Sequence, residues 1–369
     1  MTLSRRTTLA LIGGGCVLAA VGGGTLFATT RRPSTALAPW DAAGTYGDPR
    51  MNALSWAILA PNPHNRQPWL AELRGDDQIA IWRDKSLNLP ETDPFDRQLT
   101  IGMGCFLEVL RLAAAEQGIA AQAKLFPEGE GGPVATVVLA GNAAPDPLFA
   151  QVLLRHTNRQ AYDDRLPDPA ALEAMAPESS ALITDPAVVR DLRALTWDAM
   201  RIEMATHRTH MESVELMRFG KREINADPDG ITLGGPFLEA LMVAGMLTRE
   251  GQADPASGEY QQTLATLQAA MDASPAYATV TTSGNAREDQ IEAGRKWVRL
   301  HLTATAHGIS MQPLSQALQE YPEQAELYQR VHQMLAEPGE TVQMLGRIGY
   351  GPKVGPSPRW PLERRMMDA

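Results

Sequence analysis

Cysteine is nearly absent from this sequence: 369 residues contain only Cys16 and Cys105, and Cys16 lies in the N-terminal leader. A disulfide framework and a zinc site built from cysteines are therefore both excluded. Basic residues are also in deficit, because 33 Lys and Arg stand against 43 Asp and Glu, for a formal net charge of -10. No basic stripe offsets that deficit, so we expect no nucleic-acid partner.

The remaining composition is that of an ordinary globular protein. Apolar residues make up 44% of the chain and charged residues 21%. These values exclude the collagen-like, disordered and polytopic membrane classes. The length is sufficient for two domains of ordinary size.

Residues 1–32 are the exception to this composition. They contain Ser4, Arg5 and Arg6, followed by an uncharged run over residues 9–30. Such a run predicts an export signal or a single membrane anchor, since about 20 apolar residues span a bilayer. The paired arginines resemble a twin-arginine signal. We therefore expect the twin-arginine export machinery as a partner and an exported protein, either periplasmic or attached to the outer face of the cytoplasmic membrane through residues 9–30; cleavage and anchoring both stay open.

The first part of the body has a clear alternation of breaks and periodic segments. Residues 33–49 are rich in Pro, Gly and Ala and predict a linker that wraps onto the body. Hydrophobic spacing then predicts a helix over 51–59, strands over 78–82 and 135–139, and between these strands a long helix over 101–117 that is buried on most sides.

The second part begins near Asp146 and is mostly helical in pattern. A gap over 225–236 is rich in Gly, Pro and Asp and is a candidate lid. Helices are predicted over 147–154, 186–224, 236–250, 258–272, 286–307 and 323–335.

An internal repeat relates the two parts at an offset of 190 residues. It aligns Gly104 with Gly294, and it also aligns Leu110 with Leu300, Ala114 with Ala304, Gly118 with Gly308 and Ile119 with Ile309. The repeat predicts one long helix used twice, with the two copies packed together at a pseudo-two-fold axis. Coincidence between two Ala- and Leu-rich helices is the alternative.

The string from Ala60 to Trp69 is the sharpest local motif. Its prolines stop the preceding helix and place Asn65 and Gln67 on a rigid bend with amide groups free to bind a ligand. Trp69 begins the next strand and is expected to pack in the core. An ordinary loop would show the same pattern.

A second string, over residues 154–159, carries two arginines four positions apart. Arg155 and Arg159 flank Thr157 and together form a compact cradle for an anion such as a phosphate. The alternative is a solvated helix end whose charges pair with Asp163 and Asp164.

Two further strings are weaker when taken alone. Residues 311–316 follow the second long helix as a loop bounded by proline, and residues 347–352 lie near the C-terminus, ahead of 356–362. Exposed backbone amides in such a loop can hydrogen-bond a flat heterocycle.

Together these four strings resemble the nitroreductase-type FMN-binding family, in particular its Acg-like branch of tandem-fused halves. They occur in the family's order, so the resemblance spans about residues 50–362. It implies an α+β, nitroreductase-like fold, internally duplicated so that one chain mimics the family's homodimer. The first half would be 50–145 and the second half 146–369, with a helical lid insertion at about 194–247.

The resemblance also implies one FMN per chain, held between the halves. Arg155 and Thr157 would bind its phosphate and ribityl chain, Arg159 would face its pyrimidine edge, and Arg359 would complete the phosphate grip. The full set of expected cofactor-binding residues is Pro61, Asn62, Pro63, His64, Asn65, Gln67, Arg155, Thr157, Asn158, Arg159, Pro313, Leu314, Ser315 and Arg359.

The activity that follows is an FMN-dependent oxidoreductase of the nitroreductase type. Two-electron transfer would run through flavin N5, with a small-molecule donor and a small organic acceptor and without a catalytic side chain. The alternative is a non-catalytic protein that stores or sequesters FMN beneath the lid. Monomer and homodimer both stay open, because duplication removes the usual need to dimerise.

A metal site at Glu203, His207 and His210 is a third reading of the sequence. The spacing puts three ligand types on one helical face. An exposed polar face explains the same spacing, and no partner helix carries matching ligands, so we expect no metal.

Overall fold

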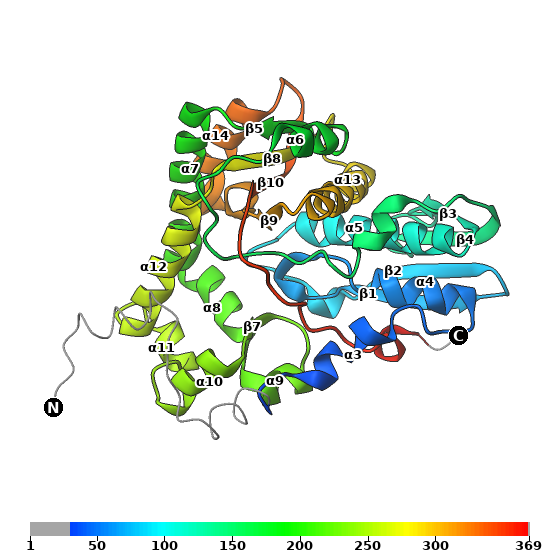
Figure 1. Ribbon diagram of the computed structural model, residues 1–369, viewed down its shortest axis with the longest axis horizontal. Helices are drawn as coiled ribbons and strands as arrows, with labels where there is room; N and C mark the ends of the chain where they lie inside the picture. The colour runs from blue at the N-terminus through cyan, green and yellow to red at the C-terminus, as the bar shows by residue number, and fades with distance from the viewer. Residues whose placement is uncertain (1–29, 368–369) are drawn as a thin grey trace.

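The computed structural model describes residues 30–367 and shows an α+β protein, which confirms the predicted class (Figure 1). Two antiparallel four-stranded sheets are covered by helices. The predicted export signal or anchor lies outside the described residues except for its last three positions.

The first sheet confirms both strands predicted in the first half. It contains β1 (Trp69–Arg74), β2 (Gln78–Arg83), β3 (Ile119–Leu125) and β4 (Ala135–Asn142), in the order β1-β2-β4-β3. Alternate residues of β4, namely Ala135, Val137 and Leu139, are buried, as expected for a strand with one face on the core.

The long helix predicted over 101–117 is confirmed as α5 (Arg97–Glu116), which connects β2 to β3. Asp93 caps it, because its carboxylate accepts hydrogen bonds from the backbone N of Gln98 and Leu99 at 3.0 and 2.9 Å. By length and composition α5 could cross a membrane, but 89% of its most apolar window is buried inside the protein. It is therefore the central helix of the core.

The second sheet repeats the plan of the first. It contains β5 (Ala181–Ile183), β8 (Ala276–Thr282), β9 (Ser310–Pro313) and β10 (Thr341–Gly349), in the order β5-β8-β10-β9. In each sheet the fourth strand lies between the second and the third, and a 20-residue helix connects the second to the third; in this sheet it is α13 (Arg287–Ala306). The shared topology supports the internal repeat that the sequence predicts.

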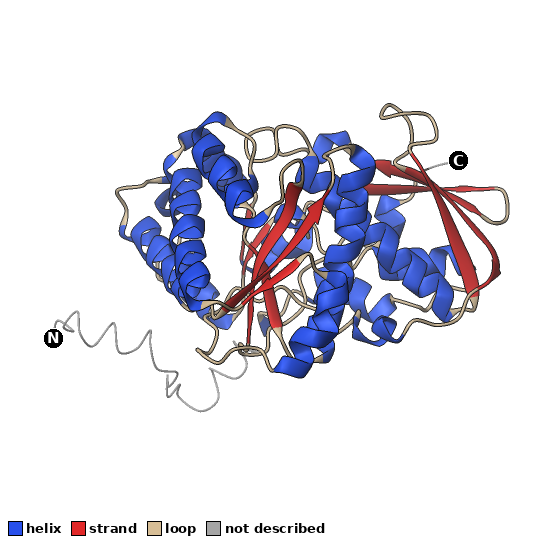
Figure 2. Ribbon diagram, turned by 90° about the horizontal axis from the view of Figure 1, so that it is seen from above, coloured by secondary structure: helices blue, strands red, loops and turns tan. Residues whose placement is uncertain are grey.

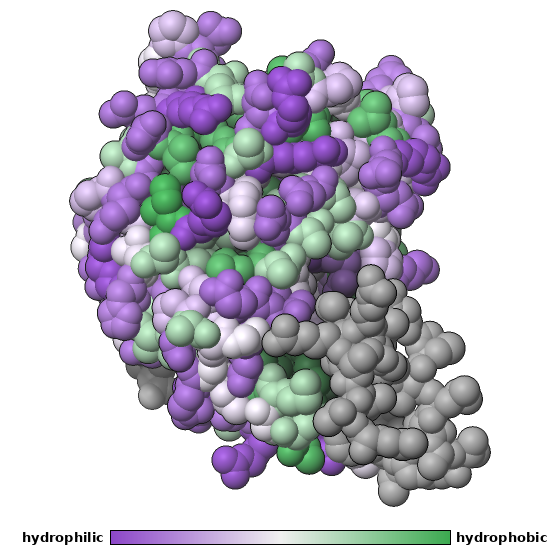
Figure 3. Space-filling model, turned by 90° about the vertical axis from the view of Figure 1, so that its left-hand side faces the viewer, coloured by the Kyte–Doolittle hydropathy of each residue, from purple (hydrophilic) through white to green (hydrophobic). Residues whose placement is uncertain are grey.

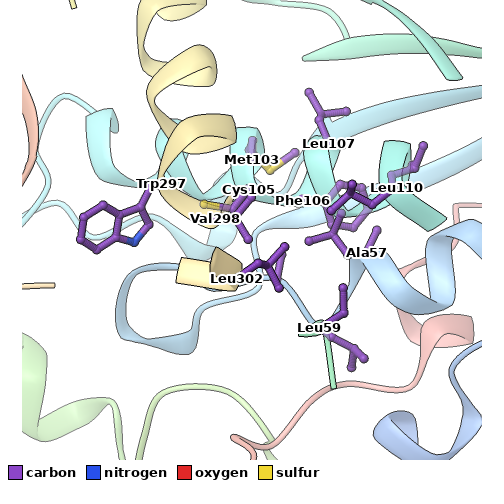
Figure 4. Close-up of a cluster of buried hydrophobic side chains, with 14 of the residues drawn as sticks. Ala57, Leu59, Met103, Cys105, Phe106, Leu107, Leu110, Trp297, Val298 and Leu302 are labelled. Atoms are coloured by element: carbon purple, nitrogen blue, oxygen red, sulfur yellow. The ribbon is translucent and has the colours of Figure 1, made fainter. Parts of the chain in front are cut away.

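The two long helices pack against each other between the sheets (Figure 2). Figure 4 shows Cys105 and Met103 of α5 beside Val298 and Leu302 of α13 in one continuous apolar cluster. The two predicted halves therefore share one apolar core where α5 and α13 meet.

The helical region of the second half is more broken than predicted. The single helix expected over 186–224 is wrong, because Thr206 has an extended ψ of 110° and interrupts it. The helix expected over 236–250 is interrupted after Val243, close to Gly245, whose φ is +66°. The elements are α7 (Pro186–Ala205), α8 (His207–Glu215), β6 (Met217–Phe219), α9 (Gly220–Ala226), β7 (Ile231–Leu233), α10 (Pro236–Val243), α11 (Arg249–Ala253) and α12 (Gly258–Asp272).

The segment expected as a linker, 33–49, instead contains a packed helix. Leu37 and Trp40 of α3 (Ser34–Ala42) are each 8% exposed and belong to the core. The helix predicted over 147–154 is a short 3-10 turn. The remaining helices are α4 (Pro49–Ala57), α6 (Pro169–Met175) and α14 (Ala325–Leu335), and the 3-10 turns are η1 (Pro63–Asn65), η2 (Lys85–Leu87), η3 (Pro147–Gln151), η4 (Ala176–Glu178), η5 (Gln316–Leu318), η6 (Pro322–Gln324) and η7 (Leu362–Arg365).

The C-terminal segment returns from β10 to the first sheet (Figure 1). Met366 forms a bridge with Ala71 of β1, and the backbone N of Met367 donates to the Ala71 carbonyl at 2.8 Å. The tail of the second half is thus part of the packing of the first half, and it carries Arg359 to the end of α4.

Candidate functional site

The bend after α4 has an unusual backbone conformation. His64, Asn65 and Gln67 have positive φ values of 46°, 54° and 52°. Residues other than glycine rarely adopt this region, and they cluster at functional sites when they do. Asn62 holds the bend closed, because its Oδ1 accepts a hydrogen bond from the backbone N of Gln67 at 2.7 Å.

A cavity lies between this bend and the second half of the chain. The space it encloses is about 800 Å³ when the open solvent at its mouth is included. The 155–159 string forms the facing wall because it pairs with β9: Thr157 bridges Met311, and the backbone N of Asn158 donates to the Met311 carbonyl at 3.0 Å. The 61–69 bend and the 155–159 string therefore meet at one site.

The structure brings ten of the fourteen expected site residues to this cavity. They are Pro61, Asn62, Pro63, Asn65, Arg155, Thr157, Arg159, Pro313, Ser315 and Arg359. The other four, His64, Gln67, Asn158 and Leu314, are not among the residues that line it.

Three of those four have structural contacts that explain their places. Gln67 is fully buried, its Nε2 donates to the Pro228 carbonyl at 2.7 Å, and its Oε1 accepts from the backbone N of Trp360 at 2.8 Å. Its amide is therefore not free for a ligand, contrary to expectation. The Asn158 side-chain amide donates to the Pro352 carbonyl after β10, and Leu314 is 1% exposed among buried apolar residues such as Leu345.

Two arginines converge on the end of α4 from opposite ends of the sequence. Arg155 Nη2 donates to the Leu59 carbonyl at 3.3 Å, and Arg359 Nη2 donates to the same oxygen at 3.1 Å. Arg155 is 4% exposed and Arg359 is 2% exposed. Arg359 is further fixed by Asn65, whose Oδ1 accepts from Nη1 at 2.5 Å. Two buried guanidinium groups thus share one neutral acceptor.

No carboxylate compensates this charge within the described part of the chain. The residues that line the cavity include no Asp or Glu, and neither Asp163 nor Asp164 pairs with Arg155 or Arg159. Burial lowers the pKa of Arg155 to about 10 and that of Arg359 to about 9, so both stay protonated at pH 7. Buried, uncompensated cations are costly unless a counter-charge is present. An anionic group in the cavity would compensate these two charges.

Two neutral histidines support this cationic end. Arg155 Nη1 lies 3.5 Å from Nδ1 of His301, whose pKa is well below its ordinary value because of burial and the adjacent Arg155 charge. The neutral imidazole can therefore accept from the guanidinium. Burial and the same charge lower the pKa of His156 to about 4, and its Nε2 is buried with no partner among the described atoms. His156 thus offers an unused polar atom beside the cavity.

Sequence reasoning missed part of the cavity lining, including its apolar walls. The missed lining residues are Gln98, Ile101, Gly102, Cys105, His156, Trp297, Met344 and Ser357. Several lie on α5 and α13 within one or two turns of the aligned pair Gly104 and Gly294, so the repeat itself was the signal that could have found them.

Gly102 and Cys105 have distinct roles on this wall. A Cβ on Gly102 would lie 3.1 Å from Cβ of Asn62, so glycine lets the bend approach α5 closely. Cys105 Sγ donates to the Gly294 carbonyl at 3.1 Å, and burial raises the pKa of its thiol to about 12. Cys105 is therefore a packing residue and not a nucleophile at neutral pH.

The insertion at 194–247 contacts the bend from outside and supplies none of the lining residues in the described chain. Asp229 forms a buried ion pair with Arg66 at 2.5 Å, and the backbone N of Gly230 donates to the Asn65 carbonyl at 3.4 Å. In this structure the insertion braces the bend; a role as a lid over a ligand stays a prediction.

The metal reading of Glu203, His207 and His210 is not supported by the positions of these residues. Glu203 is buried and accepts from Gln319 at 2.5 Å, His210 Nε2 lies 2.9 Å from the Gln252 carbonyl, and His207 is exposed. Among residues 30–367 no group of three or more potential ligands is placed to hold a metal.

Comparison with known proteins found relatives by sequence and weaker likenesses by structure. No family model matches the chain. The "Putative NAD(P)H nitroreductase" Rv3131 of Mycobacterium tuberculosis is 24% identical over 328 residues, which cover 85% of this chain and 88% of that protein. A second protein of that name from the same organism, acg, is 37% identical over 78 residues, 21% of this chain and 23% of its own length. This chain is similar to nitroreductases.

Two solved structures give a weaker likeness. A nitroreductase with bound FMN from Bacteroides fragilis has a TM-score of 0.32 and 11% identity, and it covers 56% of this chain and 89% of its own. A nitroreductase-like protein from Bacillus cereus has the same TM-score and identity, with 62% and 99% covered. TM-scores this low carry no argument, so the relationship depends on the curated relatives. They support a general oxidoreductase role of the nitroreductase type.

Proposed function

We propose that the chain is an FMN-binding oxidoreductase of the nitroreductase type that transfers two electrons to a small organic acceptor. The observation that carries the proposal is the pair of buried arginines, Arg155 and Arg359, which share the Leu59 carbonyl and face a cavity whose described lining is free of acidic residues. A phosphate monoester is the kind of anion that guanidinium forks bind best.

The cavity also suits the other part of such a ligand. Ile101, Trp297 and Met344 provide apolar surface for a flat ring, and the bend with Asn62 faces them. When bound, FMN would supply two-electron redox chemistry at its flavin ring. The residues present fit this group at both of its ends.

The residues of the chain would bind and orient the cofactor at named atoms. Arg155 and Arg359 would hold the phosphate with their guanidinium groups, and Thr157 would donate a hydrogen bond from its hydroxyl. Arg159 lines the same cavity and would place a positive charge near the ring, where it favours the added electrons.

The described cavity lining offers no side chain suited to proton transfer at neutral pH. The lowered pKa of His156, about 4, keeps this imidazole neutral, and the raised pKa of Cys105, about 12, keeps the thiol protonated. We therefore assign no catalytic acid or base to the chain, and a proton consumed by the acceptor would come from water.

Several finer points belong to the proposal. We propose one FMN per chain, export by the twin-arginine machinery, and a location in the periplasm or on the outer face of the cytoplasmic membrane. The donor and acceptor are small molecules. A monomer and a homodimer are both compatible with an internally duplicated chain.

The test uses the purified full chain. Its absorbance spectrum and the mass of the released cofactor are expected to identify FMN at one per chain, and anaerobic mixing with donors such as NAD(P)H or a quinol should bleach the flavin, which an acceptor then restores. A colourless protein that stays colourless in excess FMN would overturn the binding. Flavin that dithionite reduces but no biological donor reduces would overturn the catalytic role and favour storage.

A further inference from the structure

The short helix α10 (Pro236–Val243) buries its acidic residue and exposes apolar side chains, which is unusual for a helix on the surface of a globular protein. Surface helices normally bury their apolar stripe and expose their charged residues. In α10 the buried residue is Glu239, while Phe237 is 56% exposed and Val243 is 81% exposed. Met246, just beyond the helix, is 56% exposed. Helix α10 thus presents Phe237 and Val243 to the outside, while Leu238, Leu241 and Met242 are half-buried.

The orientation of α10 is fixed by the contacts of its single acid. Glu239 Oε1 accepts from the backbone N of Lys221 at 3.0 Å, and Oε2 pairs with Arg31 at 3.2 Å. Rotating the helix to bury its apolar side chains would expose this carboxylate and break both contacts. The contacts of Glu239 therefore hold Phe237 and Val243 on the outer side of α10.

The same contacts place the end of the N-terminal segment beside α10. Arg31 pairs with Glu239, and Lys221 Nζ donates to the Thr30 carbonyl at 3.0 Å. The segment that precedes these residues contains the uncharged run 9–30, which is long enough to span the roughly 30 Å hydrocarbon core of a bilayer as a helix. Helix α10 thus lies beside Thr30 and Arg31, the first described residues after most of that uncharged run.

Two exposed arginines are chain neighbours of the residues that contact α10. Arg31 and Lys221 lie at the base of α10, and their chain neighbours Arg32 and Arg222 are exposed. Apolar side chains flanked by Lys and Arg are the pattern of helices that lie in the interface of an anionic bilayer. Figure 3 looks at the side of the molecule where α10 lies and shows apolar surface at the lower edge of that face.

We propose that α10 docks on the surface of a lipid bilayer, as a second membrane contact in addition to the one expected of the uncharged run 9–30. Phe237, Val243 and Met246 enter the interface between headgroups and acyl chains, and Arg32 and Arg222 meet anionic headgroups. The contact fixes the orientation of the body on the membrane, with α10 toward the bilayer and α6, which lies at the other end of the molecule (Figure 1), away from it.

The test labels two positions of the full chain in a Cys16→Ser background. Cys105 is 2% exposed and does not react, so a single introduced cysteine carries the environment-sensitive fluorophore. Val243→Cys reports on α10, and Ala170→Cys, on the exposed face of α6, is the matched control. Any tether through residues 9–30 is shared by both proteins, so only the contact of α10 distinguishes them.

Vesicles of phosphatidylcholine and phosphatidylglycerol should shift the emission at position 243 to the blue, and brominated acyl chains should quench it several-fold more than at position 170. Equal quenching at the two positions would overturn the proposal. So would emission at 243 that is already shifted before lipid is added, which assigns the face to residues 1–29, or a shift that depends only on protein concentration, which assigns it to a second copy.

Discussion

Gly104 and Gly294 are packed against each other where α5 crosses α13. A Cβ on Gly104 would overlap the Ile291 carbonyl, and a Cβ on Gly294 would overlap the Ile101 carbonyl. The two contacts are equivalent, because the offset of 190 that relates the two glycines also relates Ile101 to Ile291. Reciprocal contact of this kind is what a two-fold axis produces, and the shared strand order of the two sheets supports the same interpretation.

The crossing predicts that neither glycine tolerates a side chain. Gly104→Ala and Gly294→Ala should each lower the free energy of unfolding by about 1–3 kcal/mol, because overpacking against a rigid backbone forces the helices apart. Gly258→Ala is the control, since Gly258 is the first residue of α12 and has no atom within 4 Å of an added Cβ. Urea unfolding measures all three, and equal midpoints for Gly104→Ala and Gly258→Ala would contradict the packing.

The arginine pair predicts a selective loss of cofactor. Arg155→Ala should weaken FMN binding at least about tenfold, because a charge-assisted hydrogen bond is worth about 1.5–3 kcal/mol. Arg74→Ala removes a more exposed arginine paired with Glu72 and should leave binding unchanged. The retained FMN after gel filtration and the dissociation constant by fluorescence titration are the measurements. Equal retention in the two variants would remove the phosphate assignment.

The same pair predicts that simple anions stabilise the protein freed of cofactor. Inorganic phosphate should raise its melting temperature in a saturable way, because ligands that bind only the folded state stabilise it, and chloride at equal ionic strength should not. In Arg155→Ala this increment should shrink strongly. A phosphate effect of the same size in wild type and variant would show that the anion binds elsewhere.

Trp40 predicts a coupling between helix α3 and the cationic end of the cavity. Its Nε1 donates to the Ser357 carbonyl at 2.8 Å, and its ring lies 5.3 Å from that of His156 and 5.6 Å from the Arg359 guanidinium. Trp40→Ala should therefore reduce FMN retention without changing any lining residue, and Trp40→Phe should restore part of it.

Trp56 provides the control for this effect. It packs edge-on against Phe149 at 4.6 Å on the outer side of α4. Trp56→Ala should destabilise the protein without a matching loss of FMN at a temperature where both variants are folded. If both variants lose cofactor in proportion to their loss of stability, Trp40 has only a general packing role.

Glu203 predicts a pH-dependent stability. Burial, with a smaller contribution from the charge of Glu212, raises the pKa of Glu203 to about 7. Because a raised carboxyl pKa favours the protonated folded state, its stabilising effect is complete at low pH and is lost as pH rises from about 4.5 through 7. Glu203→Gln should therefore be more stable than wild type at pH 8, by up to about 3 kcal/mol, and should match it near pH 4.5.

The control for this prediction is Glu173→Gln, at an exposed position of α6. Chemical unfolding of the three proteins at several pH values makes the comparison. A difference between Glu203→Gln and wild type that does not vary with pH would show that Glu203 does not titrate in this range.

Local sequence determined the features that depend on neighbouring residues or on fixed charge. The prolines at 61 and 63 stop α4 and create the bend, the periodicity over 101–117 specifies a helix buried on most sides, and Arg155 carries its charge wherever it lies. Ten of the expected site residues line one cavity. The motif strings identified them because these strings contain the side chains and the proline-bounded turns that form its wall.

Only the tertiary structure shows which polar side chains already have hydrogen-bond partners within the protein. The Gln67 amide faces Pro228 and Trp360, far away in sequence, and no local pattern could show that its hydrogen bonds are satisfied. Trp297 and Met344 became cavity walls only because two helices cross at a pair of glycines. The outward face of α10 likewise depends on Arg31, about 200 residues away, which holds Glu239 inward. The sequence of a segment determines its own helix, strand or turn preference. Burial and hydrogen-bond partners depend on packing between segments that are far apart in the sequence.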